Sequence, residues 1–107
     1  IQENIDCYDV TQWLGDALYL ETTRKLMKEL IHIGLLDSYR LKYSNNQEYS
    51  FWDYQAGAWQ KDNGIRIDFI LISPEIVDIL IDVGIDKVPR GQEKPSDHTP
   101  VWIEIEK

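Results

Sequence analysis

The sequence predicts an α/β fold within a single unit of 107 residues. Two segments have apolar residues at helical spacing, several short runs are rich in β-branched and aromatic residues, and turn-forming residues separate them. No linker, repeat or low-complexity tract divides the chain, so residues 1–107 are expected to form one partial domain. The predicted order of elements is helix, strand, strand, helix, strand, strand. That order has too few strands for two packed sheets, which indicates an incomplete domain.

The N-terminal third predicts one long helix. Residues 1–20 show no sustained period and are expected to form an ordered, docked loop with at most a short helical turn. A hydroxyl cap at Thr22 or Thr23 precedes an amphipathic helix. Its apolar stripe consists of Leu26, Met27, Leu30, Ile31 and Ile33. Gly34 is expected to end the helix, and His32, in its last turn, is interpreted as structural because an imidazole suits the carbonyl end of a helix.

The middle of the chain predicts two strands joined by a hairpin-like return. Residues 35–40 form a connection, and residues 49–54 are an aromatic run typical of a strand. The Asp-Asn-Gly sequence at 62–64 is a turn signal. Residues 65–73 form the strongest predicted strand of the chain.

The C-terminal third predicts a short helix followed by two strands. Pro74 suits a first helical position. The helix that it starts is expected to contain Ile76, Val77, Ile79, Leu80 and Ile81. Gly84 is expected to end this helix, residues 85–88 to form a weak strand, and residues 101–105 to form the last strand because apolar and polar side chains alternate there.

The composition narrows the functional classes. A formal net charge of −8 argues against a protein that holds nucleic acid by bulk electrostatics, so any role on DNA must be local. The apolar run at 69–72 is too short to cross a bilayer, and residues 1–4 do not resemble an export signal. The single cysteine, Cys7, cannot form an internal disulfide and is interpreted as a packing residue. These features predict a cytoplasmic protein with no membrane partner.

A short turn before the last strand carries the strongest chemical signal. It places the carboxylate of Asp97 beside the imidazole of His98, directly after Ser96. An aspartate can hold a divalent cation, and a histidine can donate to or accept from a phosphate oxygen, so the turn can serve phosphodiester hydrolysis. A capped turn without catalytic function is the alternative interpretation.

Arg66 and Asp68 are charged residues within an otherwise apolar strand. Such charges cost several kcal/mol unless each one has a partner, about 3–5 kcal/mol for a broken buried pair. For Arg66 the favoured interpretation is an arginine–carboxylate pair that joins two strands. Asp68 is instead a candidate to orient His98, because a carboxylate that fixes the tautomer of an imidazole recurs in hydrolytic sites.

Several segments of the chain, taken in order, resemble a known family. The matching blocks are residues 49–54, 63–73 and 94–101, with residues 4–9 and 34–40 fitting the region before them. Together they resemble the C-terminal half of bacterial exonuclease III, the class II apurinic/apyrimidinic (AP) endonucleases of the endonuclease/exonuclease/phosphatase superfamily. One departure is Asp62, because the family usually has asparagine two places before the glycine.

The resemblance implies a fold, an activity and partners. The fold would be the C-terminal half of a four-layered α/β sandwich, with a mixed, mostly antiparallel sheet and flanking helices. The activity would be that of a DNA repair nuclease dependent on Mg²⁺ or Mn²⁺, which hydrolyses phosphodiester bonds 5' to abasic sites and from duplex 3' ends. Its partners would be duplex DNA with such sites or ends.

By the same resemblance, three residues have expected roles at the scissile bond. Asp97 would be a divalent-metal ligand, His98 would contact the scissile phosphate, and Asp68 would hold His98.

The resemblance also implies an apolar pocket for a baseless deoxyribose. Phe51, Ile65 and Ile67 match its lining positions, and bulky apolar groups there would exclude a sugar that still carries its base. Ordinary core packing is the alternative for all three. Trp52 is a candidate for DNA contact at the rim of the groove or for packing, and the sequence leaves both open.

Other family motifs are not found in these 107 residues. They are an early glutamate metal ligand, a tyrosine that contacts the phosphate, and a Gly-Asp-Xaa-Asn motif. We therefore expect the chain alone to be inactive and to need an N-terminal half in cis or in trans. The alternatives are a noncatalytic fragment or relic of a split gene, one half of a two-chain complex, and a phosphomonoesterase or lipid phosphodiesterase of the same superfamily.

Overall fold

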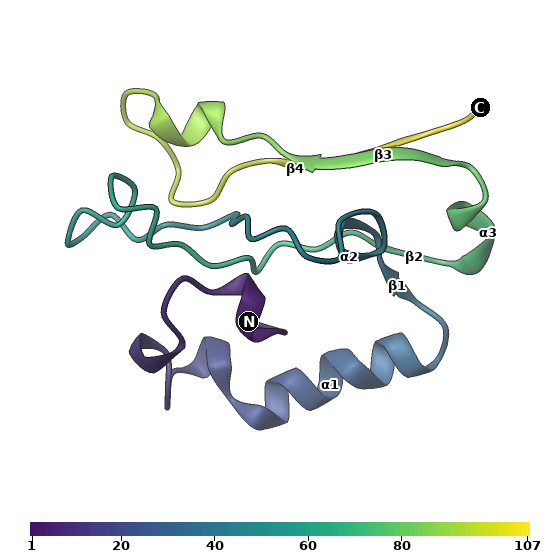
Figure 1. Cartoon of the computed structure of the whole chain (residues 1–107), viewed down its shortest axis with the longest axis horizontal. Coiled ribbons are helices and arrows are strands. Elements are labelled where there is room, and N and C mark those ends of the chain that lie inside the picture. Colours follow the sequence, from purple (N-terminus) through teal and green to yellow (C-terminus); the bar gives the residue numbers. More distant parts are fainter.

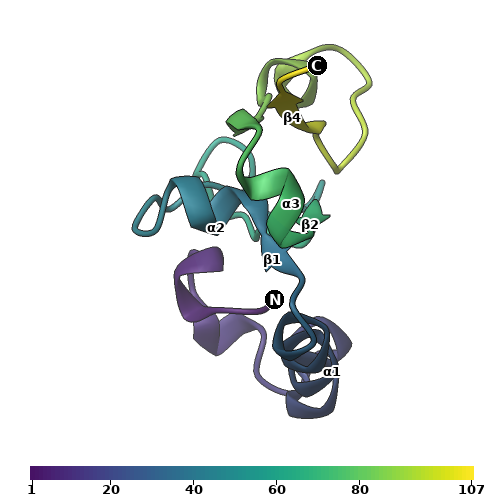
Figure 2. The ribbon, with the colours of Figure 1, turned by 90° about the vertical axis from the view of Figure 1, so that its right-hand side faces the viewer.

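The computed structural model describes all 107 residues as three layers of chain (Figures 1 and 2). One layer holds the N-terminal segment and the long helix, the middle layer holds the extended central segments, and the third holds the C-terminal strand pair. The elements are α1 (Glu21–His32), β1 (Leu36–Asp37), α2 (Ser38–Lys42), β2 (Leu71–Ile72), α3 (Pro74–Val77), β3 (Leu80–Ile85) and β4 (Val101–Ile105). β1 pairs with β2, and β3 pairs with β4, both antiparallel. The expected mixed α/β class with antiparallel pairing is therefore confirmed.

The N-terminal layer follows the prediction in part, with more short helical turns than the single one expected and with the expected long helix. The first twenty residues form an ordered loop with three short 3₁₀ turns, Asn4–Asp6, Val10–Gln12 and Ala17–Tyr19. The expected threonine cap of α1 is wrong, because the N-cap is Leu20 and makes no side-chain hydrogen bond. Gly34 does end the helix: at a φ of +112° it donates its N–H to the Ile31 carbonyl at 3.0 Å.

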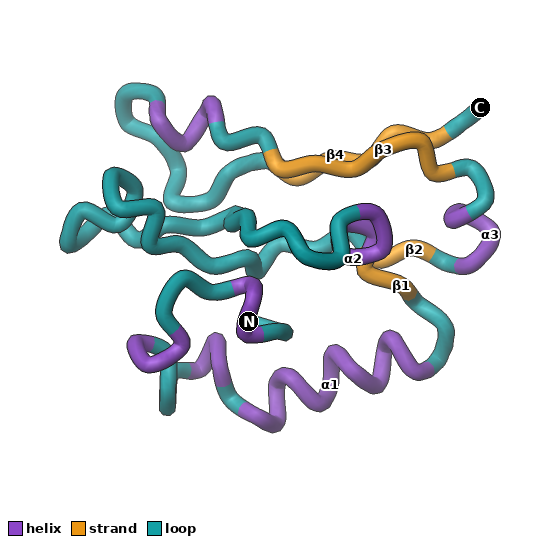
Figure 3. Tube along the Cα trace, in the orientation of Figure 1, coloured by secondary structure: helices purple, strands orange, loops and turns teal.

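The two predicted central strands are extended but are mostly not regular strands (Figure 3). Residues 49–54 take part only in isolated bridges, and of residues 65–73 only β2 is a strand. The physical reason is that side chains and loop carbonyls replace the backbone ladder. The N–H groups of Ile67 and Asp68 donate to the hydroxyl of Ser50, and the N–H of Arg66 donates to the Asp6 carbonyl.

The turn between these segments agrees with the hairpin-like return that the sequence predicts. Asp62 adopts a φ of +53°, and Asn63 donates its N–H to the Ala58 carbonyl at 2.8 Å. The turn brings Phe51 opposite Ile65 as an antiparallel bridge. The Asp-Asn-Gly signal is thus confirmed as the point where the chain reverses.

The predicted helix after Pro74 is too long. Only α3 is helical, and Leu80 to Ile85 form β3, so the expected helical residues Leu80 and Ile81 are in a strand. The weak strand at 85–88 is also wrong, since β3 ends at Ile85. The predicted strand at 101–105 is confirmed as β4. Strand pairing with β4 overrides the helical spacing of the apolar residues in β3.

Gly84 has a different role from the expected helix stop. It lies opposite Trp102 in the β3–β4 register. A Cβ atom at position 84 would lie 2.5 Å from the Trp102 ring, so the glycine makes room for the indole.

The chain is more open than a compact domain of its length. Its radius of gyration is 14.5 Å, against about 13 Å for a compact domain of about 100 residues. No residue of α1 is buried, and Leu26 and Ile33 are 63% and 76% exposed. None of the helices has the length and apolar character that a membrane crossing requires.

Candidate functional site

The site is built on a row of side chains that crosses four segments. Isolated antiparallel bridges join Cys7 to Ile65, Ile65 to Phe51, and Phe51 to His98. Because directly paired residues in neighbouring extended segments share one face, these four side chains form a continuous row. Cys7 is buried at one end, and His98 is exposed at the other. The His98 ring packs edge-on against Phe51, with the ring centres 5.2 Å apart.

The turn that carries His98 is held from two sides. Within the turn, the hydroxyl of Ser96 accepts the N–H of His98 at 3.1 Å. Toward the central segment, Trp52 donates its N–H to the Asp97 carbonyl at 2.9 Å, and Thr99 donates its N–H to the Ser50 carbonyl at 2.8 Å. The backbone on both sides of His98 is therefore tied to residues 50–52.

Asp68 and His98 are in direct contact. Oδ2 of Asp68 lies 2.8 Å from Nδ1 of His98. An ionised carboxylate can only accept a hydrogen bond, so this contact assigns the proton to Nδ1 and leaves Nε2 for a ligand. Both side chains keep access to solvent, with 33% of Asp68 and 45% of His98 exposed. The two residues that were expected to act together are thus brought together by the fold.

Asp97 provides an oxygen ligand of the right kind for a hard cation. It is half-buried next to His98, and its carboxylate makes no hydrogen bond or ion pair within the chain. Mg²⁺ is usually bound by one or two carboxylates together with water and substrate phosphates, and this donor fits that pattern. The chain has no cluster of three or more histidine, cysteine or acidic side chains that could hold a metal. Asp97 therefore fits a metal site to which other groups also contribute.

The four expected substrate-contacting residues differ in their accessibility. Phe51 and Ile67 are partly exposed, whereas Ile65 and Trp52 are fully buried. Ile65 packs against Ile1 and Cys7, and the N-terminal segment covers this cluster. In this structure Ile65 thus offers no surface to a sugar, in contrast to its expected place in a pocket lining.

Trp52 is a packing residue in this structure. Its ring packs edge-on against Trp59, with the ring centres 4.9 Å apart, and its Nε1 donates to Asp62 at 3.0 Å. Of the two interpretations that the sequence left open, packing is the one observed, and the expected DNA contact through Trp52 has no exposed surface to support it. Asp62, the residue that departs from the family pattern, serves as the acceptor for this indole.

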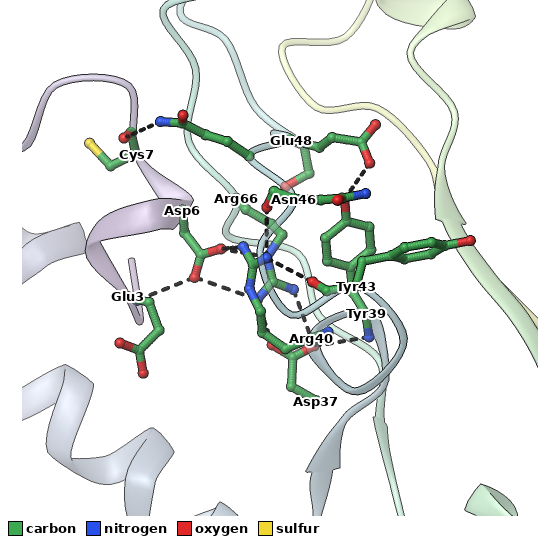
Figure 4. Close-up of polar contacts among 12 residues, drawn as sticks. Glu3, Asp6, Cys7, Asp37, Tyr39, Arg40, Tyr43, Asn46, Glu48 and Arg66 are labelled. Atoms are coloured by element: carbon green, nitrogen blue, oxygen red, sulfur yellow. Dashed lines mark hydrogen bonds and ion pairs between the residues drawn. The ribbon is translucent and has the colours of Figure 1, made fainter.

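A second charged cluster surrounds Arg66 (Figure 4). Arg66 donates to Asp6 from Nε at 2.8 Å and to Asp37 from Nη1 at 3.1 Å, and Arg40 also pairs with Asp6. Burial opposes the charge of Arg66, but the hydrogen bonds with Asp37 and Asp6 outweigh burial and raise its pKa. The interpretation of Arg66 as half of an arginine–carboxylate pair is confirmed.

The sequence did not indicate which carboxylates pair with Arg66. Asp6 and Asp37 lie 60 and 29 positions away along the chain. Only Asp37 had a signal in the sequence, because an aspartate directly after an apolar pair is typical of a helix cap. In the structure it does cap α2, accepting the N–H groups of Tyr39 and Arg40. Arg66 is 1% exposed and makes four hydrogen bonds to Asp6 and Asp37, so we place it in the scaffold and not in the site.

Comparison with solved structures defines the class of protein. The chain superposes on an AP endonuclease from Archaeoglobus fulgidus with a TM-score of 0.92 and 31% identity, covering 99% of this chain and 42% of that one. It superposes on a structure of the 3' phosphatase NExo from Neisseria bound to product DNA hairpin with a TM-score of 0.89 and 33% identity, covering 99% of this chain and 41% of that one. The fold is therefore part of an AP endonuclease and exonuclease fold.

Comparison of sequences gives the particular relationship. The chain is 38% identical to exodeoxyribonuclease III of Haemophilus influenzae over 97 residues, which is 88% of this chain and 36% of that protein. No protein-family profile matches the chain. The chain is a homologue of part of the exodeoxyribonuclease III and AP endonuclease family, and it spans just over a third of the length of this curated relative.

Proposed function

We propose that the chain is the C-terminal part of a DNA repair nuclease that acts in the cytoplasm and requires Mg²⁺ or Mn²⁺. Its reaction would be hydrolysis of phosphodiester bonds 5' to abasic sites and from duplex 3' ends. The observation that supports this best is the contact between Asp68 and His98 beside a free carboxylate at Asp97, in a chain homologous to DNA repair nucleases. The DNA hairpin bound by a structural relative agrees with DNA as the partner.

In this proposal each residue of the site has a distinct task. His98 binds a nonbridging oxygen of the scissile phosphate through Nε2, and Asp68 fixes the orientation of its ring through Nδ1. Asp97 is one ligand of the divalent cation, which supplies positive charge to the phosphate when it is bound. Phe51 and Ile67, the partly exposed pair of the expected pocket residues, would contact the baseless sugar.

We also propose that the 107 residues alone have little or no nuclease activity. A phosphoryl-transfer site needs its charges preassembled, and this chain has no cluster of three or more side chains that could hold a metal ion. The remaining ligands would come from an N-terminal half, either on the same polypeptide or on a separate chain.

The test joins or mixes this chain with the N-terminal part of exodeoxyribonuclease III from Haemophilus influenzae. Nicking of a duplex with one abasic site is measured with Mg²⁺ and with EDTA, and an undamaged duplex serves as the control. We expect Mg²⁺-dependent nicking of the abasic duplex only when both parts are present. Assembly without nicking, or no assembly at all, would support the alternative of a noncatalytic fragment.

The role of His98 is tested by His98→Asn in the complete assembly. Loss of the imidazole is expected to lower turnover by about 10²–10⁴-fold, the usual range for a group that takes part in proton transfer or in hydrogen bonding at the transition state. The matched control is His32→Asn, since His32 is the other histidine of the chain and lies exposed on α1. Near-normal turnover of His98→Asn would show that the assigned role is wrong.

A further inference from the structure

Ser50 connects the two segments that carry Asp68 and His98. It is fully buried. Its hydroxyl oxygen accepts the N–H groups of Ile67 and Asp68, each at 3.1 Å. Its carbonyl oxygen accepts the N–H of Thr99, the residue after His98, at 2.8 Å. One residue therefore holds the backbone at Asp68 with its side chain and the backbone beside His98 with its main chain.

The double contact to the hydroxyl changes the direction of the Asp68 side chain. In a regular strand, successive N–H groups and successive side chains point in opposite directions. Ile65 shares a face with Phe51 and His98, so Asp68, three positions later, would point to the opposite face of a regular strand. Because the N–H groups of Ile67 and Asp68 both turn to one oxygen, the alternation is broken between them, as in a β-bulge.

From this geometry we propose that Ser50 is a positioning residue for the Asp68–His98 pair. The inference rests on the proposed function, in which that pair acts on the phosphate. Ser50 is fully buried and contacts no substrate. Its hydroxyl turns Asp68 toward His98. Its carbonyl fixes the position of the turn that carries the imidazole, through the N–H of Thr99. Without the hydroxyl, the carboxylate loses its fixed position against Nδ1.

Ser38 provides a matched control for this inference. It is also fully buried, and its hydroxyl also bonds to the segment after Ile65, donating to the Ile70 carbonyl at 2.7 Å. No hydrogen bond joins Ser38 to Asp68 or to the turn at His98; those of its hydroxyl and its N–H both go to the Ile70 carbonyl. A purely structural role for buried serine hydroxyls would make Ser38→Ala and Ser50→Ala equivalent.

The decisive readout is the tautomer of His98. The chain is labelled with ¹⁵N-histidine and combined with the unlabelled N-terminal part if the chain alone gives no dispersed spectrum, so that only His32 and His98 are observed. Imidazole ¹⁵N shifts are recorded at about pH 9, above the ordinary pKa of histidine. In the unchanged chain the Nδ1–H form of His98 should dominate. In Ser50→Ala the ratio of tautomers should move about fivefold or more toward the Nε2–H form that prevails in free histidine.

Two results would overturn the inference. One is an unchanged tautomer ratio in Ser50→Ala, and the other is an equal change in Ser38→Ala. If Ser50→Ala does not fold, Ser50→Cys replaces it, because a thiol has similar size but is a weak acceptor, and a smaller change in the same direction is expected.

Kinetics separate this inference from the proposed function. If the unchanged assembly nicks abasic duplex, Ser50→Ala should lower kcat by about 10²-fold with little change in KM, as for a misplaced catalytic group. If the unchanged assembly has no activity, the proposed function fails, whereas the tautomer measurement still decides whether Ser50 positions the pair.

Discussion

Arg66 and Asp68 lie two positions apart in the chain, yet their surroundings are opposite. The Arg66 side chain is 1% exposed and is paired with two carboxylates, Asp6 and Asp37. The Asp68 side chain is 33% exposed and has a single charged partner, His98, which is itself 45% exposed. The first surrounding closes the guanidinium off from a ligand, whereas the second leaves the carboxylate and the imidazole partly exposed.

The difference separates charges that hold the fold from charges that can act on a substrate. A buried ion pair needs hydrogen bonds that compensate most of its charge, and its burial keeps it away from a substrate. A pair that acts on a substrate must instead remain accessible to it. Because such a pair has fewer side-chain partners, its position depends on the backbone around it. Here that support comes from Ser50, Ser96 and the bridge to Phe51.

The largest effect on stability is expected from breaking the closed cluster. Arg66→Met leaves Asp6 fully buried with Arg40 as its one remaining ion-pair partner and the N–H of Glu3 as a further donor, and should lower the free energy of unfolding by about 3–5 kcal/mol. Urea unfolding followed by circular dichroism measures the loss. His98→Asn, at the open pair, should change stability by no more than about 0.5 kcal/mol. Similar losses for the two variants would remove the distinction between the clusters.

A second effect is expected on the pH dependence of stability, through the buried Tyr49. Burial raises the pKa of Tyr49 to about 12, with the charge of Asp62 adding to the rise. The proton is then held more tightly in the folded state than in the unfolded chain, where the pKa is about 10. The associated stability is present below pH 10 and is lost as the pH rises toward 12, by up to about 3 kcal/mol. Alkaline unfolding of Tyr49→Phe should lack this loss, whereas parallel curves for the two proteins would contradict it.

A smaller effect is expected at the hydrogen bond between Trp52 and Asp62. Asp62→Gly removes the acceptor but tolerates the φ of +53°, and should cost about 1–2 kcal/mol because the buried indole N–H is left unpaired. Asp62→Asn, the residue usual in the family, keeps both the acceptor and the backbone conformation and should be nearly neutral. Urea unfolding of the two variants makes the comparison. An equal loss in both would mean that the charge of Asp62, and not its oxygen, matters.

Local signals in the sequence predicted those elements that depend on local interactions. The stripe of α1 and its glycine end, the reversal at residues 62–64 and the alternation of β4 are all present in the structure. The contact between Asp68 and His98 also followed from residue types, because a carboxylate in an apolar segment and a histidine at a strand start suggested a pair.

The misplaced elements depend on partners that are distant in sequence. Residues 80–85 have helical spacing, but pairing with β4 makes them a strand, and Gly84 faces Trp102 instead of ending a helix. Residues 65–70 have the composition of a strand, but the Ser50 hydroxyl replaces the ladder. A buried serine within an aromatic run gives no signal of its own, because its role depends on which N–H groups the fold brings to it.

Cys7 lies at the end of the row opposite to His98, so its reactivity can report local opening of the structure there. It is 2% exposed, and burial raises the pKa of its thiol, so a thiolate-selective reagent should react slowly while Cys7 remains bridged to Ile65. Since the chain has one cysteine, the labelling rate reports the exposure of a single position, which requires the N-terminal segment to separate from residue 65. The cysteine is thus a natural probe of how often the packing of the N-terminal segment on Ile65 opens. It lies at the other end of the row from His98.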